Sequence, residues 1–120
     1  MREREAGQAE SRVATQLTFA LEERGPEALE SIVVAYEPVW AIGTGLTATA
    51  DDAQAMAATI RGELDRLGGE VSRVMLVQYG GSVTPDNAGD LLACPDVDGL
   101  LVGGASLDPD KLVSIASARA

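Results

Sequence analysis

The sequence predicts an α/β fold built from three parallel strand–loop–helix units that are preceded by one helix. Two observations predict it: short apolar runs alternate with amphipathic stretches, and each apolar run leads into a loop of glycine and small polar residues. Such alternation is typical of parallel strands joined by right-handed crossovers. Because these strands end at one edge of their sheet, the three loops should meet on the face where parallel α/β folds hold their sites.

The three strands are expected where the chain is continuously apolar for a few residues. These runs cover residues 31–36, 74–77 and 99–102. An apolar run that does not alternate with polar residues is typical of a strand buried on both faces, as in a parallel sheet.

Four helices are expected from apolar residues at helical spacing. They cover residues 8–24, 49–67, 84–93 and 108–119. Thr49 and Thr84 are suited to cap helices, Asp108-Pro109 to start one and Gly25-Pro26 to end one. The apolar face of the second helix consists of Ala53, Met56, Ala57, Ile60, Leu64 and Leu67. The only lysine, Lys111, falls in the last helix and is expected at the surface.

Composition excludes several classes of function. The net charge of −10 argues against nucleic acid and anionic membranes as partners, since both need a basic surface. No apolar run approaches the ~20 residues of a membrane span, and the N-terminus does not resemble a signal peptide. The single cysteine, Cys94, fits a reducing cytoplasm. The absence of histidine removes Ser-His-Asp and Cys-His catalysis and most zinc or iron sites, so we expect no metal and no cofactor.

Glu37 directly follows the first predicted strand, at the functional edge of the sheet. A carboxylate in this place is costly to desolvate and can be tuned towards general-base catalysis. From position alone, a strand-end glutamate that lies in water or in a salt bridge is an equally good interpretation.

The loop after Glu37 is unusually long. It needs more than ten residues to reach Thr49, whereas a βα loop usually has ~2–6. Pro38 stiffens its start, Trp40 offers a bulky anchor, and small or flexible residues follow. A rigid entry, an anchor and a flexible tip are typical of a hinged lid.

The run Ala35-Tyr36-Glu37-Pro38-Val39-Trp40-Ala41-Ile42-Gly43-Thr44-Gly45 resembles the signature of triosephosphate isomerase. The resemblance implies that Glu37 is the catalytic base. It implies that the closing lid consists of Pro38, Val39, Trp40, Ala41, Ile42, Gly43, Thr44 and Gly45. It also implies the family's reaction in glycolysis and gluconeogenesis, which interconverts dihydroxyacetone phosphate and glyceraldehyde 3-phosphate through an enediolate without a cofactor.

The two later loops resemble the same family. The segment Tyr79-Gly80-Gly81-Ser82-Val83 resembles the motif after its seventh barrel strand, and Val102-Gly103-Gly104-Ala105-Ser106-Leu107 resembles the motif after the eighth. Glycines and backbone N–H groups can bind a phosphate even in an acidic chain. The resemblance implies that the substrate phosphate is bound by Gly43, Ser82, Gly103 and Gly104, and that Tyr79 contacts the closed lid. Taken alone, the first of these loops is equally well interpreted as a glycine-rich turn, and the second indicates only a phosphate-binding barrel.

The resemblance covers residues 1–120 as the C-terminal half of a triosephosphate isomerase-like barrel, from the helix after strand five onward. It implies a partial (βα)8 TIM barrel, since a complete one has ~250 residues. The family's lysine, asparagine and histidine lie in the other half. Losing one electrostatic donor costs ~10²–10³ in rate, so we expect the isolated chain to be inactive or nearly so.

Three parallel strands cannot close a barrel, and their unpaired edges favour pairing with another chain. The expected partners are a triose phosphate substrate and either further copies of the chain in a homo-oligomer or a chain that supplies the N-terminal half. Two alternatives stay open. One is a non-catalytic truncated fragment that self-associates or needs the missing half, and the other is a different phosphate-binding barrel enzyme.

Overall fold

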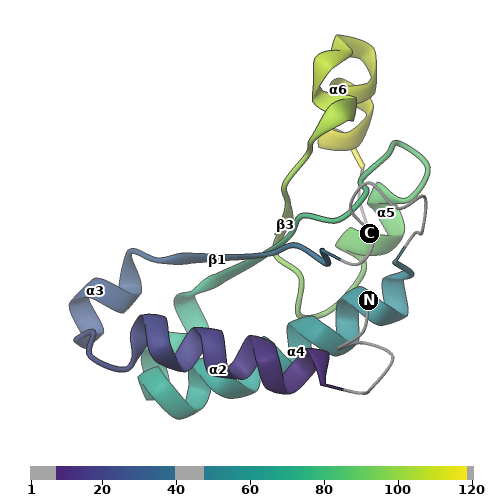
Figure 1. Ribbon diagram of the computed structural model, residues 1–120. Helices are drawn as coiled ribbons and strands as arrows, with labels where there is room; N and C mark the ends of the chain where they lie inside the picture. The colour runs from purple at the N-terminus through teal and green to yellow at the C-terminus, as the bar shows by residue number, and fades with distance from the viewer. Residues whose placement is uncertain (1–7, 40–47, 119–120) are drawn as a thin grey trace.

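The computed structural model describes residues 8–39 and 48–118 of the chain. The elements follow in the order α2 (Ala9–Leu21), α3 (Pro26–Glu30), β1 (Val33–Tyr36), α4 (Ala50–Gly68), the 3-10 helix η1 (Gly69–Val74), β2 (Leu76–Tyr79), α5 (Ala88–Leu92), β3 (Gly99–Leu100), the 3-10 helix η2 (Gly104–Leu107) and α6 (Pro109–Ala116). The strands form one parallel sheet in the order β1-β2-β3 (Figure 1). This arrangement confirms the predicted α/β fold with three parallel βα units after a helix.

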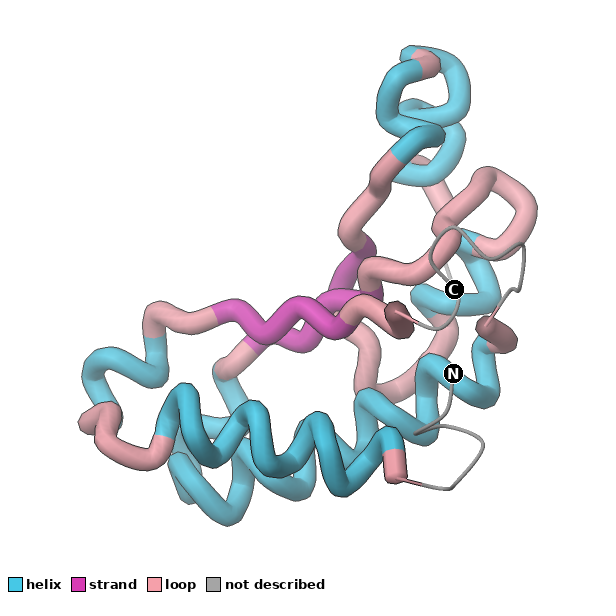
Figure 2. Tube along the Cα trace, in the orientation of Figure 1, coloured by secondary structure: helices cyan, strands magenta, loops and turns pink. Residues whose placement is uncertain are grey.

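The long helices lie on one side of the sheet. Helix α4 packs against β2, and α2 packs against α4. Figure 2 shows the strands meeting in the middle of the molecule, with α6 separated from α2 and α4 by the sheet. Helices α2 and α4 therefore lie on one side of the sheet, whereas the other side carries the exposed side chains of Val33 and Leu76. Within the described ranges, every helix is too short or too polar to cross a lipid bilayer.

The core lies between α4 and the covered face of the sheet. The predicted apolar face of α4 is confirmed, since Ala53, Met56, Ala57, Ile60 and Leu64 are buried and Leu67 is partly buried against the same core. Met75 and Val77 meet this face from β2 and its approach, and Leu91 of α5 joins the same cluster.

Two predicted helix starts are confirmed by their capping hydrogen bonds. The Asp52 backbone N–H donates to the Thr49 hydroxyl at 3.1 Å, and the Thr49 backbone N–H donates to the Asp52 carboxylate at 3.0 Å. This reciprocal capping box fixes the start of α4 directly after the long loop. At α6, the Asp108 carboxylate accepts from the backbone N–H groups of Asp110 and Lys111.

The prediction that the strands are buried on both faces is wrong. Val33 keeps 49% of its surface exposed, and its partner in the sheet, Leu76, keeps 48%. Ala35 is exposed on the same face, whereas Val34 and Tyr36 of the other face pack against the core. The apolar pattern is that of a sheet covered on both sides, but three strands form an open sheet with helices on one side only.

Several predicted boundaries are also wrong. Gly25-Pro26 does end the first helix, which stops at Leu21, but Pro26 then occupies the first turn of a new helix, α3. The chain after α4 forms η1 before it becomes extended, so β2 begins two residues later than predicted. Helix α5 begins only at Ala88, although the Thr84 carbonyl already accepts from the Ala88 N–H as in a helix. Strand β3 is an edge strand of two residues.

A charged cluster fixes the entry into β3. The Asp98 carboxylate accepts a hydrogen bond from the Val77 backbone N–H at 2.8 Å and forms an ion pair with Arg61 of α4. The Arg61 guanidinium also donates to the Met75 carbonyl oxygen. These contacts join α4, β2 and β3 near the amino ends of the strands. They therefore fix where β2 and β3 lie relative to each other along the strand direction.

Candidate functional site

The carboxyl ends of the three strands lie side by side. Tyr36 of β1 pairs with Tyr79 of β2, which pairs with Leu100 of β3. The ladder continues one step further, because the Gly80 N–H donates to the Tyr36 carbonyl at 2.7 Å and the Leu101 N–H to the Tyr79 carbonyl at 2.9 Å. The residues that follow the strands therefore meet at one edge, as the alternation of elements predicts.

Glu37 lies at this edge with an exposed side chain. A Cβ atom placed on Gly80 would lie 2.8 Å from Cγ of Glu37 and 3.3 Å from Cβ of Leu101. Gly80 therefore leaves the space in which the Glu37 side chain lies across the end of β2. In the described part of the chain, the Glu37 carboxylate has no ion pair, so the alternative of a strand-end salt bridge finds no partner there.

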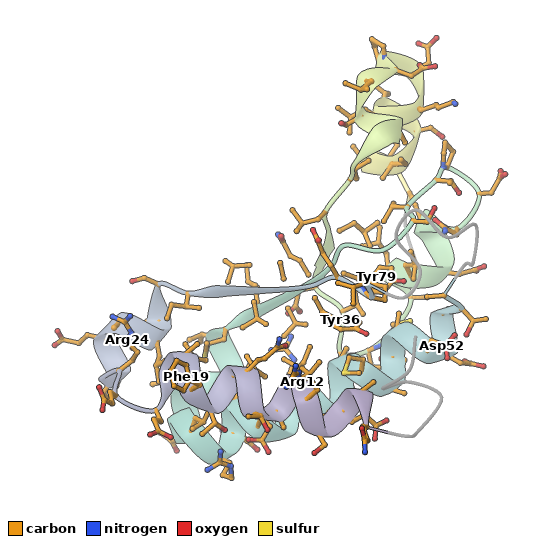
Figure 3. All side chains as sticks on the ribbon, in the orientation of Figure 1. Arg12, Phe19, Arg24, Tyr36, Asp52 and Tyr79 are labelled. Carbon is orange, nitrogen blue, oxygen red and sulfur yellow. The ribbon has the colours of Figure 1, made fainter. Side chains whose placement is uncertain are left out.

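Tyr79 is buried behind this edge, with 3% of its surface exposed. Its ring packs against that of Tyr36 at a centroid distance of 6.4 Å (Figure 3). Its phenol also fills the space in which a side chain at Gly81 would lie. Burial, together with the nearby Tyr36 and Asp52, raises the pKa of Tyr79 to about 12. Both tyrosines and Asp52 line a cavity of about 300 Å³ between β1 and the start of α4.

The raised pKa of Tyr79 predicts a loss of stability at high pH. The folded state holds the phenolic proton more tightly than the unfolded chain, whose tyrosine pKa is ~10. The resulting stability is complete below pH ~10 and is lost as the pH rises to about 12. We expect the free energy of unfolding to fall by ~2 kcal/mol more in the wild type than in Tyr79→Phe over this range. Urea unfolding at pH 9.5 and 12 measures it, and parallel curves for the two proteins would contradict it.

The two glycine loops line one open cavity of about 540 Å³. Ser82 enters it from the loop after β2, and Gly103 and Gly104 enter it from the loop after β3. Within residues 8–39 and 48–118, several lining residues have backbone N–H groups that donate no hydrogen bond: Gly81, Ser82, Val83, Gly103, Gly104 and Ala105. Backbone N–H groups without an acceptor in the protein are available to donate to an anion.

The Asn87 side chain stabilises the turn that contains Ser82 through two hydrogen bonds. The Thr84 N–H donates to the Asn87 side-chain oxygen at 2.8 Å, and the Asn87 side-chain amide donates to the Ser82 carbonyl at 2.7 Å. The carbonyl oxygen of Ser82 is therefore occupied, whereas its N–H donates to no acceptor among the described residues. The prediction that Thr84 caps a helix is wrong: Thr84 caps a turn that lines the cavity, and Asn87 lies at the N-cap of α5.

The remaining predicted site residues lie partly outside the described residues. Pro38 is buried and Val39 is exposed at the start of the predicted lid, while Trp40, Ala41, Ile42, Gly43, Thr44 and Gly45 fall in the part that the structure does not describe. The predicted contact between Tyr79 and the lid and the predicted phosphate contact of Gly43 stay predictions. Among the described residues, no group of three or more potential ligands could hold a metal ion.

Comparison with known proteins decides the family. The family model described as triosephosphate isomerase matches residues 1–119. The chain belongs to the triosephosphate isomerase family. It is 53% identical over 120 residues to the triosephosphate isomerase of Stenotrophomonas maltophilia strain K279a, covering all of this chain and 48% of the relative. It is 49% identical over 118 residues to that of Hydrogenovibrio crunogenus, covering 98% of this chain and 47% of the relative. For Chloroflexus aurantiacus the identity is 54% over 114 residues, covering 94% and 46%.

The chain thus spans about half the length of the curated triosephosphate isomerases that it matches. Membership of the family confirms the resemblance inferred from the three loops. The half-length match also agrees with the open sheet, since a partial barrel leaves one sheet face without cover.

The sequence did not indicate two further residues of the cavity. Lys111 of α6 is exposed, as predicted, but it also lines the cavity, together with Asp86. The sequence feature that could have indicated Lys111 is its position in the capped first turn of α6, only a few residues after the glycine loop. Its side chain becomes part of the wall because η2 folds the intervening residues into a single tight turn.

Proposed function

We propose that this chain supplies the base and the phosphate-binding loops of a triosephosphate isomerase. The observation that carries the proposal is the convergence of two glycine loops, with their unused N–H groups, on one cavity next to Glu37. Glu37 and the cavity are connected through neighbouring residues of the loop after β2. Gly80 touches the Glu37 side chain, and the next residue, Gly81, already lines the cavity.

In this proposal the cavity binds the phosphate of a triose phosphate, and Glu37 reacts with its carbon chain. The Ser82 hydroxyl and the loop N–H groups donate to the phosphate oxygens, which needs no basic surface. Glu37 removes a proton from one carbon and returns it to the neighbouring carbon, which interconverts dihydroxyacetone phosphate and glyceraldehyde 3-phosphate. An exposed carboxylate with no partner among the described residues is free to accept that proton.

The charge that develops on the enediolate oxygens must be stabilised by other groups. Electrostatic stabilisation of this kind is usually the largest catalytic term. The chain has no histidine, and its only lysine lies at the cavity of the phosphate loops. We therefore propose that the electrophilic groups come from the segment that corresponds to the other half of the relatives, either within a longer protein or from a separate chain.

The same segment would cover the open sheet face and pair the free edges of β1 and β3. A simple dimer of this chain brings six strands together, whereas a closed barrel of this kind needs eight. A complementing N-terminal half is therefore the better partner. Activity in glycolysis and gluconeogenesis, and a place in the cytoplasm, follow from the same proposal.

The alternative is a chain of this family that binds phosphate without catalysing isomerisation. The open face and the absence of histidine favour it for the 120-residue chain on its own. The two functions differ in one measurable property, which is turnover after the missing half has been supplied.

Complementation tests the proposal. The chain is purified and assayed for isomerase activity alone, and again after refolding with the N-terminal half of the Stenotrophomonas maltophilia relative. We expect no measurable turnover alone and clear turnover in the mixture. Normal turnover by the chain alone would contradict the need for a second half, and a stable but inactive complex would favour the non-catalytic alternative.

A further inference from the structure

The cavity of the glycine loops has an unusual balance of charge. Among the described residues, two ionisable side chains line it, Asp86 and Lys111. They come from different segments, Asp86 from the turn after β2 and Lys111 from the first turn of α6. With both ionised, their charges cancel. Without Lys111 the cavity would present one carboxylate to an anion, in a chain whose net charge is already −10.

The backbone fixes Lys111 beside the loop. The Gly103 carbonyl accepts from the Ser106 N–H at 2.9 Å, and the Ala105 carbonyl accepts from the Asp108 N–H at 3.3 Å. Asp108 then caps α6 by accepting from the Lys111 N–H at 3.2 Å. The path from Gly103 to Lys111 is thus a continuous series of tight turns.

The rest of α6 anchors this arrangement. Ile115, one turn after Lys111, is buried in the core cluster, whereas Lys111 and its neighbours are exposed. Ile115 therefore packs α6 onto the core, and Lys111 in the first turn lines the cavity. In the described part of the chain, the Lys111 ammonium takes part in no ion pair, so a bound anion meets no competing carboxylate partner.

We propose that Lys111 is a specificity-determining residue of the phosphate cavity. Among the described residues it is the only positive side chain that lines the cavity, and so it makes the cavity selective for a phosphate dianion over an uncharged group. Backbone N–H groups supply the hydrogen bonds, and Lys111 supplies the charge that offsets Asp86. This proposal rests on the proposed phosphate-binding function, because it assigns the residue that balances charge in that same cavity.

The chain allows a selective test, because Lys111 is its only lysine. Reductive methylation with ¹³C-formaldehyde labels Lys111 and the N-terminal amine and keeps the positive charge on both. Inorganic phosphate is titrated at constant ionic strength while the labelled methyl signals and the backbone amide signals are followed by NMR. We expect the Lys111 signal and the amides of the two glycine loops to shift with one common dissociation constant.

Three variants sharpen the result. Lys111→Gln should weaken phosphate binding roughly five- to tenfold, the range of a partly exposed charge-assisted contact. Lys111→Arg should keep most of the affinity, and Asp86→Asn should increase it. Arg73→Gln is the matched control, since it removes one exposed positive charge outside the residues that line the cavity.

The outcomes separate this proposal from the proposed function. If phosphate shifts the loop amides but Lys111→Gln binds as tightly as Arg73→Gln, Lys111 has no role, and the phosphate cavity stands. If the wild type shows no shift in either loop, the phosphate cavity itself is wrong and the role of Lys111 falls with it. A fall in affinity for Lys111→Gln that Lys111→Arg restores supports the assignment.

Discussion

Replacing Glu37 with glutamine is expected to lower the turnover of the complemented protein by roughly 10²–10⁴-fold, the contribution typical of a positioned general base. Glutamine has almost the same shape as glutamate, so it should fit the space beside Gly80. It cannot accept a proton from carbon at neutral pH, so the step that Glu37 is proposed to carry out is lost. The measurement is kcat of the complex with the N-terminal half, for wild type and variant.

The control for this experiment separates the base from the phosphate cavity. Glu30→Gln removes an exposed carboxylate at the end of α3 and should leave turnover unchanged. Phosphate affinity should be equal in wild type, Glu37→Gln and Glu30→Gln, because Glu37 does not line the cavity. Full turnover in Glu37→Gln would show that another group is the base.

Replacing Ile60 with alanine is expected to have the largest effect on stability. Ile60 lies near the middle of α4 with 1% of its surface exposed, in the core cluster. Isoleucine-to-alanine changes in a core cost ~2–5 kcal/mol, because the side chain is lost and a cavity is left behind. In a chain whose sheet is covered on one face only, this cost is a large share of the total stability. Urea unfolding followed by circular dichroism measures the change.

Phe19→Ala is the matched control for the core substitution. Phe19 is larger than Ile60 and also lies in a helix, but 91% of its surface is exposed (Figure 3). Its loss should change the free energy of unfolding by no more than ~0.5 kcal/mol. A similar loss of stability in both variants would mean that α2 packs on its Phe19 side in solution.

Local signals predicted the elements that depend on local interactions. The start of α4 follows from a threonine and an acidic residue three positions apart, which form the capping box. The start of α6 follows from Asp108-Pro109 in the same way. The alternation of apolar runs and helices was enough to predict parallel strands and a common edge for their loops.

What the sequence could not predict depends on contacts that are distant along the chain or absent from it. The pattern of the strands is suited to cover on both faces, so the exposure of Val33 and Leu76 could not be inferred from them. The shift of β2 depends on η1, a helix of 3-10 type that no apolar periodicity marks. The role of Lys111 in the cavity wall depends on the turn that η2 makes before α6.

The same distinction holds for the candidate site. The family resemblance indicated Glu37, Ser82, Gly103 and Gly104, and the fold brings their segments to one edge of the sheet. It could not indicate that Gly80 provides the space for the Glu37 side chain. That requirement becomes visible only when two strands are paired in register.

The open face of the sheet has a thermodynamic consequence. Val33 and Leu76 present apolar surface that no described residue covers. Any molecule that binds this surface in the folded state, and not in the unfolded state, shifts the folding equilibrium by mass action. The melting temperature of such a chain then depends on the binding partner as well as on the chain itself. It rises with the concentration of whatever covers the sheet, and the dissociation constant of that contact becomes part of the stability of the fold.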